Sequence, residues 1–287
     1  MKKHLLRVAA ISVAGLSAQG LLSGQSASPA TPKFEVASVK ECKAGDRSPP
    51  TISSPGRLSL GCWNLKTVIL QAYEVFASGK VDPLNPVLPL TPVEGDPAWI
   101  NSARYSIDAK AETPQSGAMM RGPMMQALLE ERFHMRTHRE IREVPVYLMT
   151  VDKGGPKFRP TKEGSCLPVD TSGDLTAHHP DGEPCAAVKV ARKGPTTVFD
   201  FRGFTLAVFA GDLHPDGRHV IDRTGLAGPF DIHLELETAA PDSADPGGAA
   251  SDPLPVAMRQ QLGLRLVPGK GPVEFLVIDH IEKPSEN

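Results

Sequence analysis

A pattern of helix and strand signals that occurs twice constrains the fold of this chain more than any other feature. In 124–151, apolar residues at helical spacing are followed by alternating apolar and polar residues, and then by a run rich in β-branched and aromatic residues. The same order returns in 256–278, with Pro272 standing where Pro145 stands in the first stretch. Each stretch therefore predicts a helix, a strand, a turn and a second strand.

Three earlier segments have counterparts in the second half of the chain, two at an offset of 141 residues and one at an offset of 125. Each pair shares either a strand-like alternation or one apolar helix face. The pairs are 57–60 with 198–201, 65–73 with 206–213, and 105–111 with 230–236. In-order matches of this kind favour an internal duplication. We therefore expect an α+β fold of two duplicated β-α-β-α-β-β modules, whose mainly antiparallel sheets are covered on one face by helices.

Loop and linker signals divide the chain. Proline, glycine and small residues concentrate between the periodic segments, and the run TAAPDSADPGGAASD lacks apolar periodicity altogether. The predicted parts are a signal peptide at 1–27, a first module at 28–153, a cysteine-containing loop linker at 154–196, and a second module at 197–283 with a disordered insertion at 238–252.

The N-terminus indicates export. Lys2, Lys3 and Arg7 precede a short apolar run at 8–16, which small residues follow. This order is typical of a cleaved secretory signal, and the run is too short for a stable membrane span. No later stretch approaches the roughly 18 apolar residues that a span needs. We expect a periplasmic or extracellular protein without membrane insertion after cleavage.

Four cysteines, an even number in a chain expected to be exported, favour disulfides. Three pairings are possible. We favour Cys42 with Cys62 and Cys166 with Cys185, because each pair brackets one loop rich in proline and glycine, and closing such loops restricts the unfolded chain.

Charge gives no case for nucleic acid or anionic membrane as a partner. The formal net charge is −2 and the isoelectric point is near 6.5, whereas such partners attract strongly basic surfaces.

Three phrases resemble a known family: FEVASVK, LLEERFHMRTHREIREVPVYLMTVDKGGPK and VIDRTGLAGPFDIHLELE. They are similar to the soil-associated secreted protein family, which has no established function and many paralogues in soil bacteria. Similar domains are sometimes fused to BlaR-type membrane metallopeptidase sensors. The resemblance implies sensing or binding outside the cytoplasm and carries over no catalytic residue. The helix-strand-strand order is also similar to the signalling domains of secretins and TonB-dependent receptors, which is a likeness of fold alone.

Asp222 and Arg223, followed by Thr224 and Gly225, form the sharpest local pattern. One interpretation is a ligand-binding or catalytic pair, with the arginine holding an anion. The other is a turn, in which the aspartate accepts hydrogen bonds from the following amides. We favour the turn and keep both residues as candidate ligand-binding positions.

The histidines and methionines do not indicate a metal site or a cofactor. His134 and His138 are expected on the polar face of a strand, and His178-His179 with Asp181 lacks an evident further ligand. The methionines at 119–125 fit helix packing better than copper binding. The nucleophile-elbow, H-E-x-x-H, Walker A and G-x-G-x-x-G patterns are absent from the sequence.

These observations favour an exported, non-catalytic binding or sensing domain. Its partner would be a small ligand, a cell-wall fragment or a protein. Two alternatives remain: a secreted hydrolase with a pocket between the modules, and an interaction module that uses an exposed sheet edge.

Overall fold

The computed structural model describes residues 32–43, 45–46, 51–81, 91–168, 182–237 and 253–284. Residues 31–287 group as one compact unit. The expected signal peptide, the insertion at 238–252 and His178-His179 with Asp181 lie outside the described residues.

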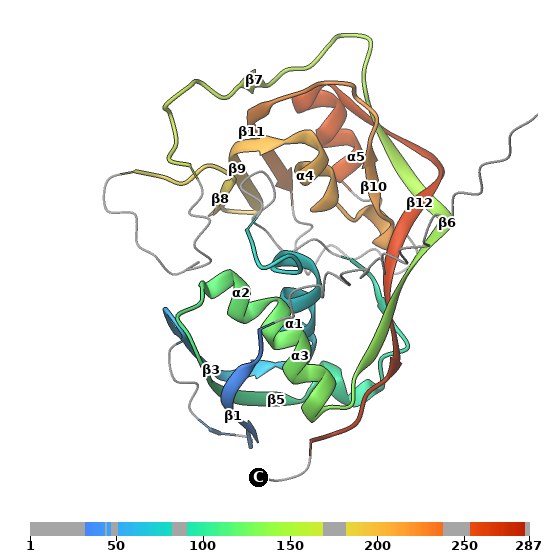
Figure 1. Ribbon diagram of the computed structural model, residues 1–287. Helices are drawn as coiled ribbons and strands as arrows, with labels where there is room; N and C mark the ends of the chain where they lie inside the picture. The colour runs from blue at the N-terminus through green and yellow to red at the C-terminus, as the bar shows by residue number, and fades with distance from the viewer. Residues whose placement is uncertain are drawn as a thin grey trace, which may run out of the picture. The chain divides into compact units, whose positions relative to one another are not determined.

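The fold is α+β with more strand than helix, and its strands form three four-stranded sheets in the described part of the chain (Figure 1). The first and second sheets are antiparallel throughout. In order, the first holds β1 (Phe34–Glu41), β5 (Arg104–Ala111), β3 (Arg57–Asn64) and β2 (Ile52–Ser54). The second holds β7 (Arg159–Pro160), β11 (Pro229–Glu237), β9 (Thr196–Thr205) and β8 (Ala187–Lys193).

The third sheet is mixed. Its long strands β6 (Arg136–Val151) and β12 (Leu264–His280) pair antiparallel along their length, with a short parallel strand on each outer side. These short strands are β10 (Val220–Asp222), beside β6, and β4 (Val93–Glu94), beside β12.

Short helices connect the strands, and side-chain caps begin several of them. Asn64 accepts a hydrogen bond from the Thr67 amide, and Thr205 accepts one from the Val208 amide, each at 3.3 Å. The α-helices are α1 (Leu65–Leu70), α2 (Gly117–Arg121), α3 (Pro123–Arg132), α4 (Leu206–Gly211) and α5 (Leu254–Ala257). Two π-helices, η1 (Gln71–Val75) and η5 (Met258–Leu262), extend α1 and α5, and 3-10 turns occupy η2 (Ala98–Asn101) and η3 (Pro215–Gly217).

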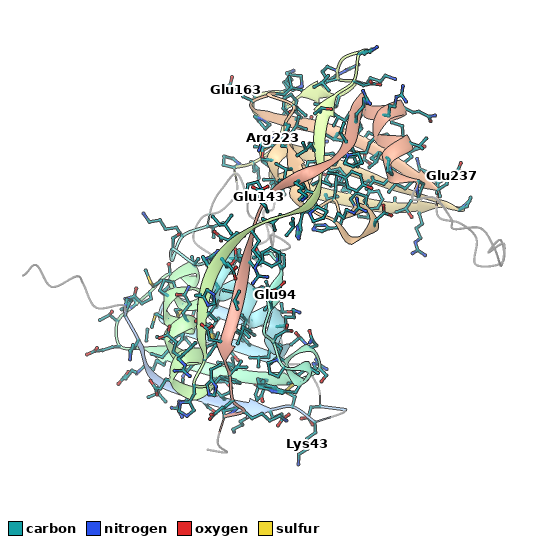
Figure 2. The ribbon with its side chains drawn as sticks, turned by 90° about the vertical axis from the view of Figure 1, so that its right-hand side faces the viewer. Lys43, Glu94, Glu143, Glu163, Arg223 and Glu237 are labelled. Atoms are coloured by element: carbon teal, nitrogen blue, oxygen red, sulfur yellow. A yellow bond between two sulfur atoms is a disulfide. The ribbon has the colours of Figure 1, made fainter. Side chains whose placement is uncertain are left out.

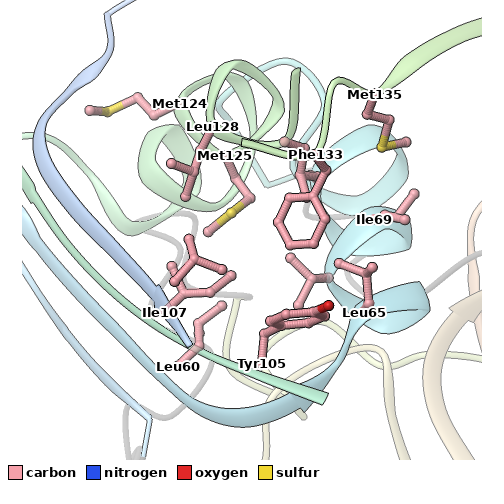
Figure 3. Packing of buried hydrophobic residues seen from close by; sticks show 14 of the residues in the cluster. Leu60, Leu65, Ile69, Tyr105, Ile107, Met124, Met125, Leu128, Phe133 and Met135 are labelled. Atoms are coloured by element: carbon pink, nitrogen blue, oxygen red, sulfur yellow. The ribbon is translucent and has the colours of Figure 1, made fainter. Parts of the chain in front are cut away.

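Each antiparallel sheet has its own apolar core. In the first core, Met125, Leu128 and Phe133 lie opposite Tyr105 and Ile107 of β5 (Figure 3). The rings of Tyr105 and Phe133 meet edge to face at 5.1 Å between centroids.

The second core contains a cluster of three phenylalanines. Phe201 meets Phe204 and Phe209 edge to face at 5.2 and 5.0 Å between centroids. The amphipathic helix faces expected from the sequence are therefore buried against sheet faces, as predicted.

Each long strand reaches the core of the other half of the chain. The end of β12 places Leu276 and Ile278 in the first core. The end of β6 places Met149 in the second core, where it lies opposite Leu266 of β12. Each half of the chain therefore completes its core with a strand end from the other half.

The turn expected within each long strand is absent. β6 and β12 are continuous, and they run side by side (Figures 1 and 2). The middle of β6 is charged and largely exposed, and Ile141 there is 68% exposed. A strand solvated on both faces needs no apolar row, so its polar composition was misread as a turn.

Several segments expected as loops contain strands. β2 lies in 41–56, β4 in the proline-rich run 81–97, and both β7 and β8 in 154–196. Edge strands bury little surface, so their hydrophobic signal is weak.

Both expected disulfides are present. Cys42 is bonded to Cys62, and Cys166 to Cys185. Cys62 lies at a β-bulge with φ of 49°, and the matching bulge of the second sheet has Gly203 with φ of 70°. A Cβ on Gly203 would lie 3.1 Å from Cys185 Cβ, so the second disulfide also adjoins its bulge.

Candidate functional site

The outer edge of β8 is the most exposed run of regular backbone in the second sheet. This seven-residue strand pairs with β9 on one side, and no described residue pairs with its other side. Every residue of β8 after Ala187 is exposed. Such an edge presents unpaired N–H and C=O groups, which favours the addition of another strand.

Two valines of β8 continue the apolar face of the second sheet into solvent. Val188 lies opposite Phe201, and Val190 opposite Phe199, so these side chains share one face. The rings of Phe199 and Phe201 are stacked at 6.2 Å, and Phe201 belongs to the second core. Val188 and Val190 are nevertheless 44% and 58% exposed. We call this pair of side chains the valine shelf.

The opposite face of the same sheet carries charged side chains. Lys189 lies opposite Asp200, which lies opposite His233 on β11. Glu183 forms ion pairs with Lys189 and, at 2.8 Å, with Arg202. These groups line a hollow of about 380 Å³.

His233 stands between two carboxylates in this charged face. Its Nδ1 is 2.6 Å from Asp200 Oδ1, and its Nε2 is 3.3 Å from Glu235 Oε1. The hydrogen bond to Asp200 is the main cause that raises the pKa of His233. The described residues that line the hollow include no serine, threonine or cysteine. The arrangement suits recognition of charge, with the imidazole held toward its cationic form.

Asp222 and Arg223, the candidate ligand-binding residues, lie at the end of β10. One Asp222 carboxylate oxygen accepts from the Thr224 amide at 2.9 Å and from the Thr224 hydroxyl at 2.7 Å, the geometry of an Asx turn. The Arg223 amide donates to the Met149 carbonyl. The Arg223 side chain is exposed (Figure 2). The two positions therefore form the expected turn, and ligand binding by them stays a prediction.

The structure gives the positions of the histidines and methionines that were weighed as metal ligands. His134 lies just before β6 with φ of 48°, so its expected place on a strand is wrong. His138 is an exposed residue of β6, as expected, and its Nδ1 is 3.0 Å from Asp279 Oδ1. Met120, Met124 and Met125 are at most 1% exposed, which confirms the packing interpretation. In the parts of the chain that the structure describes, three or more histidine, cysteine, aspartate or glutamate side chains do not gather as a metal site would require.

Sequence reasoning missed β8 because the segment was assigned to a linker loop. Its signal is present in AVKVARKGPTT, where Val188 and Val190 alternate with Lys189 and Ala191 before a Gly-Pro turn. The lysines and arginine made the segment read as polar, although charges are common on edge strands.

The fold and this edge define an α+β protein with a valine-bearing edge strand, whose outer side pairs with no described residue. The chain belongs to the DUF3738 family, described as a protein of unknown function, whose family model matches residues 69–281. The match runs from α1 to the residue after β12. No curated protein and no solved structure matches the chain significantly.

Proposed function

We propose that this protein is an exported, non-catalytic binding module that docks an extended, acidic segment of another polypeptide along β8. The observation that carries the proposal is the unpaired edge of β8 with the valine shelf beside it. Main-chain hydrogen bonds along such an edge supply affinity, and alternate side chains supply specificity.

Charge indicates the chemistry of the partner. β8 carries Lys189, Arg192 and Lys193 and no acidic residue. Glu183 pairs with Lys189, and the ends of Arg192 and Lys193 lie on an exposed strand. A segment that alternates apolar and acidic residues would place its apolar side chains on the valine shelf and its carboxylates on the opposite face, beside Lys189 and Lys193.

The disulfides support export. Both disulfides join the residues expected from the sequence, and such bonds persist in oxidising compartments. No helix among the described residues has the length and apolar character to cross a membrane. The signal-like N-terminus and the resemblance to soil-associated secreted proteins and BlaR-type sensor domains are consistent with binding outside the cytoplasm.

We also infer that the two halves arose by duplication. The element order β1, β2, β3, α1, β4, β5, α3, β6 has the same form as β7, β8, β9, α4, β10, β11, α5, β12. The strand orders of the two antiparallel sheets also correspond. In this correspondence β2 and β8 are equivalent edges, but β2 has three residues and β8 has seven. Of these two equivalent edges, β8 alone is long enough to align several residues of a peptide.

The test measures binding of a blocked synthetic peptide of alternating valine and glutamate, with a valine–lysine peptide as its charge-reversed counterpart. We expect the acidic peptide to bind and the basic peptide to bind much more weakly. Val188→Ser/Val190→Ser removes the shelf. Together, the exposed fractions of Val188 and Val190 amount to about one whole valine side chain. Burial of this area by a partner therefore contributes about 1.5 kcal/mol of binding free energy, or roughly tenfold in affinity.

Ile52→Ser on β2 is the matched control, because Ile52 is 54% exposed on the equivalent edge. It should leave peptide binding unchanged. Absence of binding by the acidic peptide, or equal affinity for the double variant and the wild type, would refute docking on β8.

A further inference from the structure

We propose that a second hollow, where η5 meets the start of β12, binds a small organic anion with an apolar body, such as an alkyl carboxylate or phosphate ester. The hollow has a volume of about 640 Å³. The lining residues that carry the argument are Asp152, Lys157, Val256, Arg259, Arg265 and Leu266. The proposal is independent of docking on β8.

Asp152 orients two guanidinium groups into this hollow. Arg259 Nε donates to Asp152 Oδ2 at 3.0 Å, and Arg265 Nε lies 3.9 Å from Asp152 Oδ1. The Asp152 side chain is 18% exposed, whereas the Arg259 and Arg265 side chains are 67% and 51% exposed. The less exposed Asp152 carboxylate therefore contacts the Nε atom of both arginine side chains.

The far edges of both guanidinium groups remain accessible. The contacts of Arg259 and Arg265 with described residues run through Nε, so their terminal amino groups are open to a ligand. Two planar guanidinium forks that share one anchor match the oxygen geometry of a carboxylate or phosphate.

The charge balance of the hollow favours an anion. Arg259, Arg265 and Lys157 face a single carboxylate, that of Asp152. Lys157 Nζ donates to the Gln260 carbonyl at 2.7 Å, which fixes its ammonium at the rim. An anion of charge −2 would neutralise the surplus, and one of charge −1 would halve it.

Apolar surface lies beside these cations. Val256 of α5 is 56% exposed, and Leu266 packs at the margin of the second core. A bare inorganic anion would leave this surface in water, whereas an alkyl or aromatic group attached to the anion would cover it. The ligand is therefore expected to carry both a charged head and an apolar body.

The equivalent place in the other half has a different charge. The hollow at the start of β6 is lined by Glu130, His134, Arg136, His280 and Glu282, among others. Its two carboxylates face a single arginine, so it lacks the cationic surplus. Arg136, which corresponds to Arg265, supplies a matched control.

The test is a calorimetric titration of the full protein with octyl phosphate, kept below its micelle concentration. Inorganic phosphate, which has the charge without the apolar chain, and octyl glucoside, which has the apolar chain without the charge, are titrated for comparison. We expect octyl phosphate to bind at least tenfold more tightly than either. Added salt should weaken binding, because the guanidinium groups are partly exposed.

Arg259→Gln and Arg265→Gln should each weaken octyl phosphate binding by tenfold or more, and Val256→Ser should weaken it by a smaller factor. Arg136→Gln should have no effect. All four side chains are on the surface, and thermal unfolding of each variant verifies that it is folded. The proposal fails if octyl phosphate does not bind, if the Arg136 variant loses as much affinity as the Arg265 variant, or if octyl glucoside binds equally well.

Discussion

Asp212→Asn is expected to stabilise the protein at neutral pH and to lose this effect in acid. Asp212 ends α4 and is partly buried. Burial raises the pKa of its carboxyl from 3.8 to about 6. Its position after the last turn of α4 adds to the cost of a negative charge, because helix C-termini carry partial negative charge.

The sign of the effect follows from linkage. The folded-state pKa is raised, so the stability associated with the neutral carboxyl is present below the unfolded value of 3.8 and is lost as the pH rises through about 6. About two pKa units correspond to roughly 3 kcal/mol. Because the side chain keeps partial access to water, we reduce this to about 1–2 kcal/mol.

The assay is thermal unfolding of wild type and variant between pH 4 and pH 8. At pH 7.5 the asparagine variant should melt about 3–6 °C higher, since 1 kcal/mol shifts the midpoint of a chain of this size by roughly 2–4 °C. The gain should shrink to a small fraction at pH 4. Glu237→Gln, at the exposed end of β11 (Figure 2), removes an equal charge and should show no such dependence. A gain that is the same at both pH values would refute the role of burial.

Three further changes test the fold. Gly122→Ala would place a Cβ inside the contact distance of the Phe76 carbonyl oxygen, so we expect a loss of at least about 3 kcal/mol in urea unfolding. Gly211→Ala, which meets open space, should be nearly neutral, and equal losses would contradict the clash. Asn64→Ala and Thr205→Ala should each cost about 1 kcal/mol of unfolding free energy through loss of the helix cap; no change in either would argue against capping. Cys166→Ser/Cys185→Ser opens a loop with a sequence separation of 19 and should cost about 3 kcal/mol in thermal unfolding, whereas an unchanged midpoint would show that the disulfide adds nothing.

Sequence patterns predicted those elements that bury one face. The alternation of Tyr105 and Ile107 indicated β5, and the helical spacing of Met125, Leu128 and Leu129 indicated α3, because each row packs in the first core. The cysteine pairing was also predicted, since each pair closes one local loop.

The patterns failed where an element is solvated on both faces or makes a close backbone approach. β8 and the middle of β6 expose most of their residues. The two valines of β8 and the charged middle of β6 therefore give only a weak strand period. Gly122 makes such a close approach, because it lies against the Phe76 carbonyl although the two residues are far apart in the sequence.

The arginines of the proposed anion hollow could not be grouped from the sequence. Arg265 is the second residue of β12, Arg259 lies in the π-helix η5, and Asp152 follows the partner strand β6. Only the register of β6 with β12, in which Val151 lies opposite Leu264, brings the three together.

The shared long strands restrict how this architecture could have begun. A polypeptide of half the length, ending after β6, would lack the residues corresponding to Leu276 and Ile278 that close its core. A second molecule would have to supply them, and the two molecules would exchange their long strands. Under the duplication that we infer, the single-copy ancestor would have been an obligate homodimer with exchanged strands, and joining two gene copies would have converted that dimer into one chain.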